Sequence, residues 1–210
     1  METLIPGLFL YPDFIDLAKE TKLLNEIDGQ SWIVDYQRRL QYYGFRNELE
    51  TPYNLVSYPI SIPQEIDQLA LEIVEKHILD HQPDQVIINE YLPGQGIKSH
   101  KDRAYYENQI CGINLGSGCV MKFTNTSTFE VIDVVIPRRS LYVMQDDARK
   151  KWSHAIPPRK KDMINGNIVH RDRRVSITYR KVKPSRVQPL DPNGKVAQML
   201  AENLGVSMRL

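Results

Sequence analysis

The chain of 210 residues has only two cysteines, no long apolar run and a net charge of +1. Cys111 and Cys119 are too few for a disulfide-stabilised scaffold, so we expect both as reduced core thiols in a reducing compartment. No apolar run approaches the ~20 residues that a membrane helix requires. The first residues, METLIPGLFLYPDF, lack the basic and apolar regions of a secretory signal. These absences predict a protein of the cytoplasm or nucleus that is neither secreted nor membrane-embedded.

A net charge near zero excludes a global electrostatic attraction to nucleic acid. Basic residues nevertheless cluster along the chain, at 38–39, 138–139, 149–151, 159–161 and 171–174. A folded chain can gather such clusters into one positive face, or leave them scattered as solvated charge. The composition leaves both alternatives open.

The order of apolar patterns predicts a single domain over 1–210 that is mostly β with flanking helices. Helical periodicity covers 13–28 and 63–79, and Ser61 and Gln64 are spaced as a capping box for the second helix. After Pro83 only short β-prone runs follow, at 86–91, 110–115, 120–124, 130–136, 140–144 and 175–182. This spacing is typical of an antiparallel sandwich or jelly roll, braced here by two N-terminal helices.

Two segments stand apart from this pattern. Residues 31–58 are rich in tyrosine and arginine, which suits either base stacking with phosphate contacts or a hairpin with cross-strand tyrosines and solvated arginines. Residues 184–210 form a polar tail that ends in a short amphipathic stretch. We expect that stretch to be a helix docked on the domain or an element that binds a partner.

The segment NEYLPGQGIKSHKD provides a candidate metal site. His100 and Asp102 lie two residues apart in an extended segment and therefore project to the same side. His154 and His170 are candidates for a third ligand, and we favour His154 because it lies in a strand-like run, whereas His170 is surrounded by charge. Two histidines and one carboxylate are typical of non-haem Fe(II) oxygenases, whereas zinc more often recruits cysteine or a third histidine.

The C-terminal strand carries a candidate site for an acidic co-substrate. Arg174 and Arg180 are six residues apart in RVSITYR and therefore face the same side of a strand. Their guanidinium groups are suited to a dicarboxylate, and Asn89 and Tyr91 lie on one face of an earlier strand. The alternative is that both arginines are surface residues of an edge strand.

These segments, together with PRRSLYVMQDDARKKWSHAIPPR, resemble the AlkB family of Fe(II)- and 2-oxoglutarate-dependent dioxygenases over residues 32 to 183. The resemblance implies a double-stranded β-helix, which is the jelly roll, with Fe(II) bound by His100, Asp102 and His154. It implies that 2-oxoglutarate is held by Asn89, Tyr91, Arg174 and Arg180. Ser176 stands where some members have Asn, and its assignment to the co-substrate is the weaker one.

The resemblance also implies the reaction and its substrate. O2 and 2-oxoglutarate serve to hydroxylate a C–H bond, which demethylates or hydroxylates a modified base in DNA or RNA. Residues 31–58 then form a nucleotide-recognition lid, in which flipped bases are held by aromatic faces. Its stacking candidates are Tyr42, Tyr43 and Phe45, and its phosphate or base contacts are Arg38, Arg39 and Arg46. The alternative is the same core acting on a protein or a small molecule. We expect a monomer.

Overall fold

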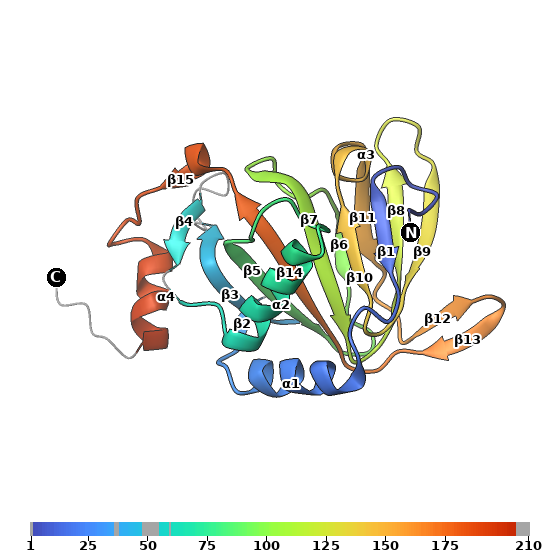
Figure 1. Cartoon of the computed structure of the whole chain (residues 1–210), viewed down its shortest axis with the longest axis horizontal. Coiled ribbons are helices and arrows are strands. Elements are labelled where there is room, and N and C mark those ends of the chain that lie inside the picture. Colours follow the sequence, from blue (N-terminus) through green and yellow to red (C-terminus); the bar gives the residue numbers. More distant parts are fainter. Residues whose placement is uncertain (1, 36–37, 48–54, 59, 205–210) are drawn as a thin grey trace.

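The computed structural model describes residues 2–35, 38–47, 55–58 and 60–204, which form two packed sheets with helices on one side (Figure 1). The large sheet has the order β1 (Leu8–Tyr11), β10 (Leu141–Met144), β7 (Tyr106–Leu115), β14 (Arg174–Val182), β5 (Gln85–Tyr91), β3 (Arg38–Asn47), β4 (Leu55–Tyr58), β15 (Val187–Gln188), and β2 (Ile33–Asp35) pairs with β3. The small sheet has the order β6 (Ile97–His100), β11 (Trp152–Ile156), β8 (Cys119–Asn125), β9 (Val131–Ile136). The predicted jelly roll with flanking helices is confirmed.

The two faces of the large sheet separate packing from chemistry. On β14, Val175, Ile177 and Tyr179 are fully buried and belong to one hydrophobic core with residues of α1 (Leu17–Asp28) and α2 (Gln64–Glu75). The alternate residues of β14 face the small sheet, because successive strand side chains point to opposite faces. Burying each aliphatic side chain contributes about 1.5–3 kcal/mol. The helices therefore pack on one face of the large sheet, and its other face is left for contacts with the small sheet.

The two long helices stabilise each other through their ends. Asp16 caps α1 by accepting a hydrogen bond from the Lys19 amide at 2.7 Å. The predicted capping box at Ser61 is not formed, because Pro63 is the N-cap of α2 and makes no side-chain cap bond. The Glu26 carboxylate of α1 instead accepts hydrogen bonds from the amides of Glu65 and Ile66 at 3.0–3.3 Å. A partner distant in sequence thus takes the role that local spacing had assigned to Ser61.

Replacing Glu26 with glutamine should lower the free energy of unfolding by about 1 kcal/mol, because a charged cap at the positive end of α2 becomes neutral. Urea denaturation measures this loss. Glu75→Gln is the matched control, since Glu75 is exposed at the last turn of the same helix and should change stability by less than about 0.5 kcal/mol. Equal losses in both variants would argue against the cap.

The space between the sheets is filled by a second hydrophobic core. Tyr91, Tyr142 and Met144 from the large sheet pack with Met121 and Phe123 from the small sheet. On β7, a Cβ atom at Gly112 would lie 2.3 Å from the ring of Tyr142. Glycine is therefore required there, because it lets the tyrosine lie flat against the neighbouring strand.

One element was not predicted. After β11 the chain forms a hairpin of β12 (Lys161–Ile164) and β13 (Asn167–His170), which projects from the body of the molecule (Figure 1). His170 is therefore an exposed strand residue rather than part of a charged turn. The sequence pattern did not predict the hairpin, because its strands are only four residues long and mix charged with apolar side chains.

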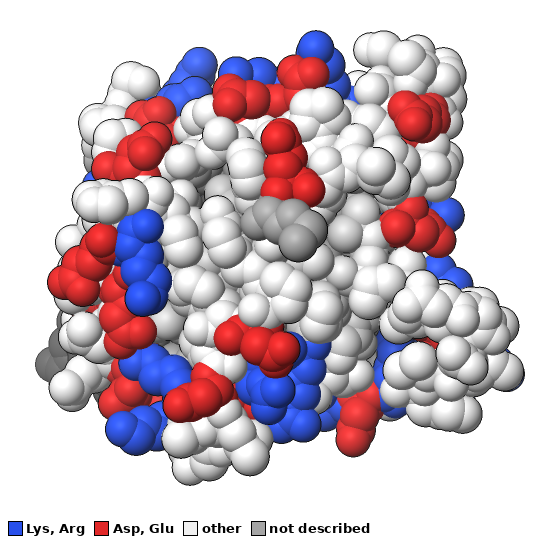
Figure 2. Space-filling view, turned by 45° about the vertical axis from the view of Figure 1, so that its right-hand side comes forward, with Lys and Arg blue, Asp and Glu red and all other residues white. Residues whose placement is uncertain are grey.

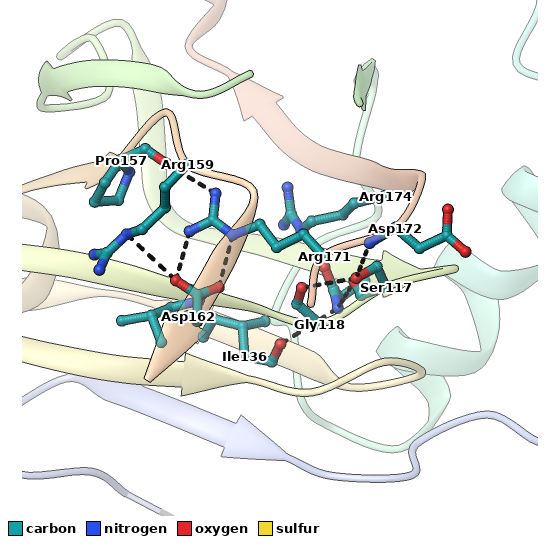
Figure 3. A network of polar contacts seen from close by, with 11 residues as sticks. Ser117, Gly118, Ile136, Pro157, Arg159, Asp162, Arg171, Asp172 and Arg174 are labelled. Carbon is teal, nitrogen blue, oxygen red and sulfur yellow. Dashed lines mark hydrogen bonds and ion pairs between the residues drawn. The ribbon is translucent and has the colours of Figure 1, made fainter. Parts of the chain in front are cut away.

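The base of this hairpin is held by a buried ion pair (Figure 3). Arg171 donates to both carboxylate oxygens of Asp162, at 2.6 and 2.8 Å, and to the Pro157 carbonyl at 2.8 Å. Asp162, only 3 % exposed, also accepts a hydrogen bond from the Val120 amide. Burial raises the pKa of Asp162, but the bonds from Arg171 and Val120 outweigh burial and lower the pKa below its usual value. The network anchors the connection between β11 and β14.

Because the pKa of Asp162 is lower in the folded state, its ion pair stabilises the fold above the unfolded pKa of about 4 and is lost as the pH falls through the folded value. The free energy of unfolding should therefore drop less steeply below about pH 4 in Asp162→Asn than in wild type. Asp133→Asn, which removes a carboxylate from an exposed pair with Lys122, is the control and should keep the wild-type acid dependence. Superimposable curves for wild type and Asp162→Asn would contradict the prediction.

Most of the basic clusters meet acidic partners. Arg138 pairs with Glu20 and Arg139 with Asp13. Arg173 pairs with both Asp28 and Glu90. On the face shown in Figure 2, positive and negative residues interleave around a largely uncharged centre. The structure therefore shows that the charges of these clusters are scattered and are compensated by carboxylates.

The remaining elements are α3 (Asp146–Lys150), the 3-10 helix η1 (Pro184–Arg186) and α4 (Lys195–Leu204). The predicted amphipathic tail helix is α4, which packs against β4 through Val196 and Leu200; residues 205–210 lie outside the described part. Cys111 and Cys119 are buried free thiols, as expected. Among the described residues, no helix is long and apolar enough to cross a membrane.

Candidate active site

One pocket between the two sheets brings together the predicted metal and co-substrate residues. Its lining includes, among others, Asn89, Tyr91, His100, Asp102, His154, Arg174, Ser176 and Arg180. Strand register explains the gathering, because Arg174 lies opposite Tyr91 and Ser176 opposite Asn89 on the paired strands β14 and β5. The pocket therefore joins residues that are up to 91 positions apart, from Asn89 to Arg180.

At one end of the pocket lie the two histidines and the aspartate. His100 and His154 are direct partners across β6 and β11, and their ring centroids are 4.4 Å apart. Nε2 of His154 lies 3.7 Å from Oδ2 of Asp102. His170 is not part of this group, since it lies exposed on β13. The structure thus places His154, rather than His170, beside the predicted pair.

Electrostatics put His154 and Asp102 in the protonation states that metal binding needs. Burial lowers the pKa of His154 to about 4, so its imidazole is neutral at pH 7. Burial raises the pKa of Asp102, but the Arg180 charge and its hydrogen bond, with the two histidines, lower it well below its usual range. Metal ligands must be deprotonated imidazole and carboxylate. The donor set therefore fits Fe(II).

The Asp102 carboxylate is hydrogen-bonded to Arg180 and is not part of a preformed metal site within the described residues. Its Oδ1 accepts hydrogen bonds from Nη2 and Nε of Arg180 at 2.7 and 3.1 Å. Within the described ranges, no three or more His, Cys, Asp and Glu side chains are already arranged to hold a metal ion. The backbone register and donor chemistry fit the metal, which His100, His154 and the Asp102 carboxylate would hold.

At the other end of the pocket, the guanidinium of Arg174 has donors available to bind an anion. It is 3 % exposed, its Nε donates to Asn114, and it lies over the Tyr91 ring at 5.1 Å. Its Nη1 and Nη2, and Nη1 of Arg180, are buried without a hydrogen-bond partner. A buried donor left unsatisfied costs about 1–3 kcal/mol. The two arginines therefore fit the two carboxylates of 2-oxoglutarate.

Sequence reasoning missed Asn114, which contacts Arg174, and several residues of the pocket lining, among them Tyr142 and Thr178. Asn114 orients Arg174 and donates in turn to the carbonyls of Ser117 and Pro137. A single asparagine in the apolar run ICGINL was the signal for the first, because a buried amide in a strand requires partners.

The lid residues divide between the two faces of β3. Arg38 lies at the pocket, where its Nε donates to Asn89 at 3.0 Å and its guanidinium lies 5.6 Å from the Tyr91 ring centroid. Arg39 points to the opposite face and forms a bidentate pair with Glu90. Tyr43 belongs to the helix-covered core and is 3 % exposed. Neither Arg39 nor Tyr43 is therefore placed to contact a substrate.

The outer part of the lid forms its own stack. Arg46 lies over the rings of Tyr42 and Tyr58, at 4.4 and 5.7 Å from their centroids. Phe45 is partly buried against the inner core. Residues 36–37 and 48–54 of the predicted lid lie outside the described residues. The stack leaves Tyr42 and Phe45 partly accessible.

Comparisons with known proteins identify the family of this chain. The family model of the 2OG-Fe(II) oxygenase superfamily matches residues 7–180. An uncharacterized protein of Acanthamoeba polyphaga mimivirus is 48% identical over 87% of this chain and 88% of its own length. The tRNA (carboxymethyluridine(34)-5-O)-methyltransferase of Xenopus tropicalis is 32% identical over 87% of this chain, which spans only 33% of that protein.

The fold has a solved counterpart. The structure of OsALKBH1 superposes with a TM-score of 0.62 at 12% sequence identity and covers 86% of this chain and 100% of its own. The family match establishes an enzyme that uses Fe(II), 2-oxoglutarate and O2. The chain belongs to the 2OG-Fe(II) oxygenase superfamily and is an AlkB-like 2-oxoglutarate-dependent dioxygenase.

Proposed function

We propose that this dioxygenase oxidises a modified base of DNA or RNA, with residues 1–210 acting as a single domain. His100, Asp102 and His154 hold the iron. Arg174 and Arg180 hold 2-oxoglutarate, with Asn89, Tyr91 and Ser176 as further contacts. Bound iron with O2 and 2-oxoglutarate supplies the oxidation of a C–H bond, and the protein supplies orientation and exclusion of water.

Each charged residue has a defined task in this proposal. Arg174 would bind one carboxylate of 2-oxoglutarate, and its guanidinium is positioned for this by Asn114 and the Tyr91 ring. Arg180 keeps Asp102 ionised and directs its carboxylate. Apolar side chains such as Ile97, Met121 and Ile156 line the rest of the pocket and keep water out.

Contact between the lid and the pocket carries the substrate assignment. Arg38 joins β3 to Asn89 and Tyr91, so the Tyr- and Arg-rich strand begins at the reaction centre. Tyr42 and Phe45, both partly accessible, follow along the same strand, whereas Arg46 is 2 % exposed and packs on Tyr42 rather than facing a substrate. Aromatic rings along this strand are suited to stack on a flipped base, and the guanidinium group of Arg38 is suited to contact a neighbouring phosphate.

The similar proteins support a nucleic acid as the partner. The Xenopus protein is named for an activity on tRNA, and this chain matches a third of its length. The methyltransferase activity in that name is therefore not part of the proposal. We further propose that the protein acts as a monomer inside the cell, where its two buried thiols stay reduced.

Incubation with Fe(II), 2-oxoglutarate and a panel of methylated DNA and RNA oligonucleotides tests the proposal. We expect succinate formation stimulated by one class of oligonucleotide, with formaldehyde released where the oxidised carbon is an N-methyl group. His100→Ala is the inactive control. Succinate formation that no oligonucleotide stimulates would instead favour the same core acting on a protein or a small molecule.

A further inference from the structure

A second, larger cavity adjoins the active-site pocket at Asp102. It measures about 470 Å³, against about 50 Å³ for the inner pocket, and it is open to solvent. Both cavities share Asp102, so whatever occupies the larger one lies next to the metal end of the site. Tyr106 also lines the larger cavity; it is buried, and the Arg180 guanidinium lies 5.0 Å from its ring centroid.

The wall of this cavity is rich in cations. Four line it, Lys101, Arg149, Lys150 and Lys183, against two carboxylates, Asp102 and Glu107. Asp102 is already engaged by Arg180. Lys150 pairs with Asp146, whereas the other three cations form no ion pair within the described part of the chain.

Three of these cations have only main-chain carbonyl partners among the described residues. Lys101 donates to the Lys150 carbonyl at 3.3 Å and Lys183 to the Ala104 carbonyl at 2.9 Å. Arg149 donates to the carbonyls of Glu107 and Arg103, both at 3.2 Å, and its Nε is buried without a partner. Carbonyls fix the direction of a cation without neutralising its charge, so the wall keeps a positive potential.

We propose that this cavity binds a phosphate group of the nucleic-acid strand whose base enters the active site. A phosphate presents several acceptor oxygens to lysine and arginine donors at once. A strand supplies such a group beside the target nucleotide, and the cavity lies beside the metal end of the pocket. The inference rests on the proposed function, because the strand is the proposed substrate.

Binding of an unmodified single-stranded oligonucleotide, measured by fluorescence anisotropy over a range of salt concentrations, tests the proposal. The double variant Lys101→Gln/Lys183→Gln should bind about tenfold more weakly, and its log–log salt dependence should be shallower by about 1.4, the value for two lost phosphate contacts. The control is Lys22→Gln, which makes the same charge change on the exposed side of α1 and should stay within about twofold. Thermal unfolding confirms that each variant is folded.

The outcomes separate this inference from the proposed function. Equal affinity and equal salt dependence in wild type and double variant would overturn the phosphate site, even if methylated oligonucleotides are oxidised. Weaker binding by the double variant would support the site, even if no oligonucleotide is oxidised. Titration with inorganic phosphate at constant ionic strength tests whether the cavity instead binds a free phosphate compound. If the wild type binds inorganic phosphate saturably, the double variant loses that binding, and both bind the strand equally, the assignment to a strand is overturned.

Discussion

Replacing His154 with alanine should abolish 2-oxoglutarate turnover, with a loss of at least about a thousandfold. Changing an outer partner of a metal ligand already costs about 10–100-fold, and removing a ligand costs more. His154 lies opposite His100 in the paired strands, and its Nε2 lies 3.7 Å from Oδ2 of Asp102, so its removal leaves two of the three proposed ligands. Succinate formation and titration with Mn(II) measure turnover and metal binding separately.

His170→Ala is the matched control for this experiment. His170 is the other histidine of the C-terminal half, and it lies exposed on β13. It should retain turnover and Mn(II) affinity within about twofold of wild type, as expected of an exposed residue outside the site. A His154→Ala protein that binds metal normally, beside a His170→Ala protein that does not, would reverse the assignment of the third ligand.

Replacing Arg174 with methionine should weaken 2-oxoglutarate binding about a hundredfold, or about 2.7 kcal/mol. The physical reason is the buried guanidinium, whose Nη1 and Nη2 have no protein partner and are available to a carboxylate. Calorimetry with the Mn(II)-loaded protein measures the affinity. Arg174→Lys should recover only part of it, because lysine keeps the charge but not the planar fork.

Arg173→Gln provides the control for a neighbouring charge. Arg173 is the preceding residue, but it pairs with Asp28 and Glu90 on the helix-covered side of the sheet. Its loss should reduce the stability of the protein and leave the affinity for 2-oxoglutarate within about twofold of wild type, because its side chain faces away from the pocket. Wild-type affinity in Arg174→Met would show that the co-substrate carboxylate is held elsewhere.

Local periodicity was sufficient for much of the fold and of the site. The two-residue alternation of strands placed Arg174 and Arg180 on one face, and Asn89 and Tyr91 on another strand's face, before any contact was known. Short β-prone runs separated by turn signals identified the strands after Pro83, and apolar spacing identified both N-terminal helices. These features depend on neighbours within a few residues, and the sequence shows such neighbours directly.

Long-range pairing decided the rest. Register between β6 and β11 selected His154, and pairing of β3 with β5 sent Arg38 into the pocket and Arg39 to Glu90. Packing of α1 beside α2 replaced the predicted cap with Glu26, and β7 brought Asn114 to Arg174. The sequence by itself determined which residues share a strand face, whereas only the tertiary structure decided which faces meet, because strand register and helix packing join residues far apart in the chain.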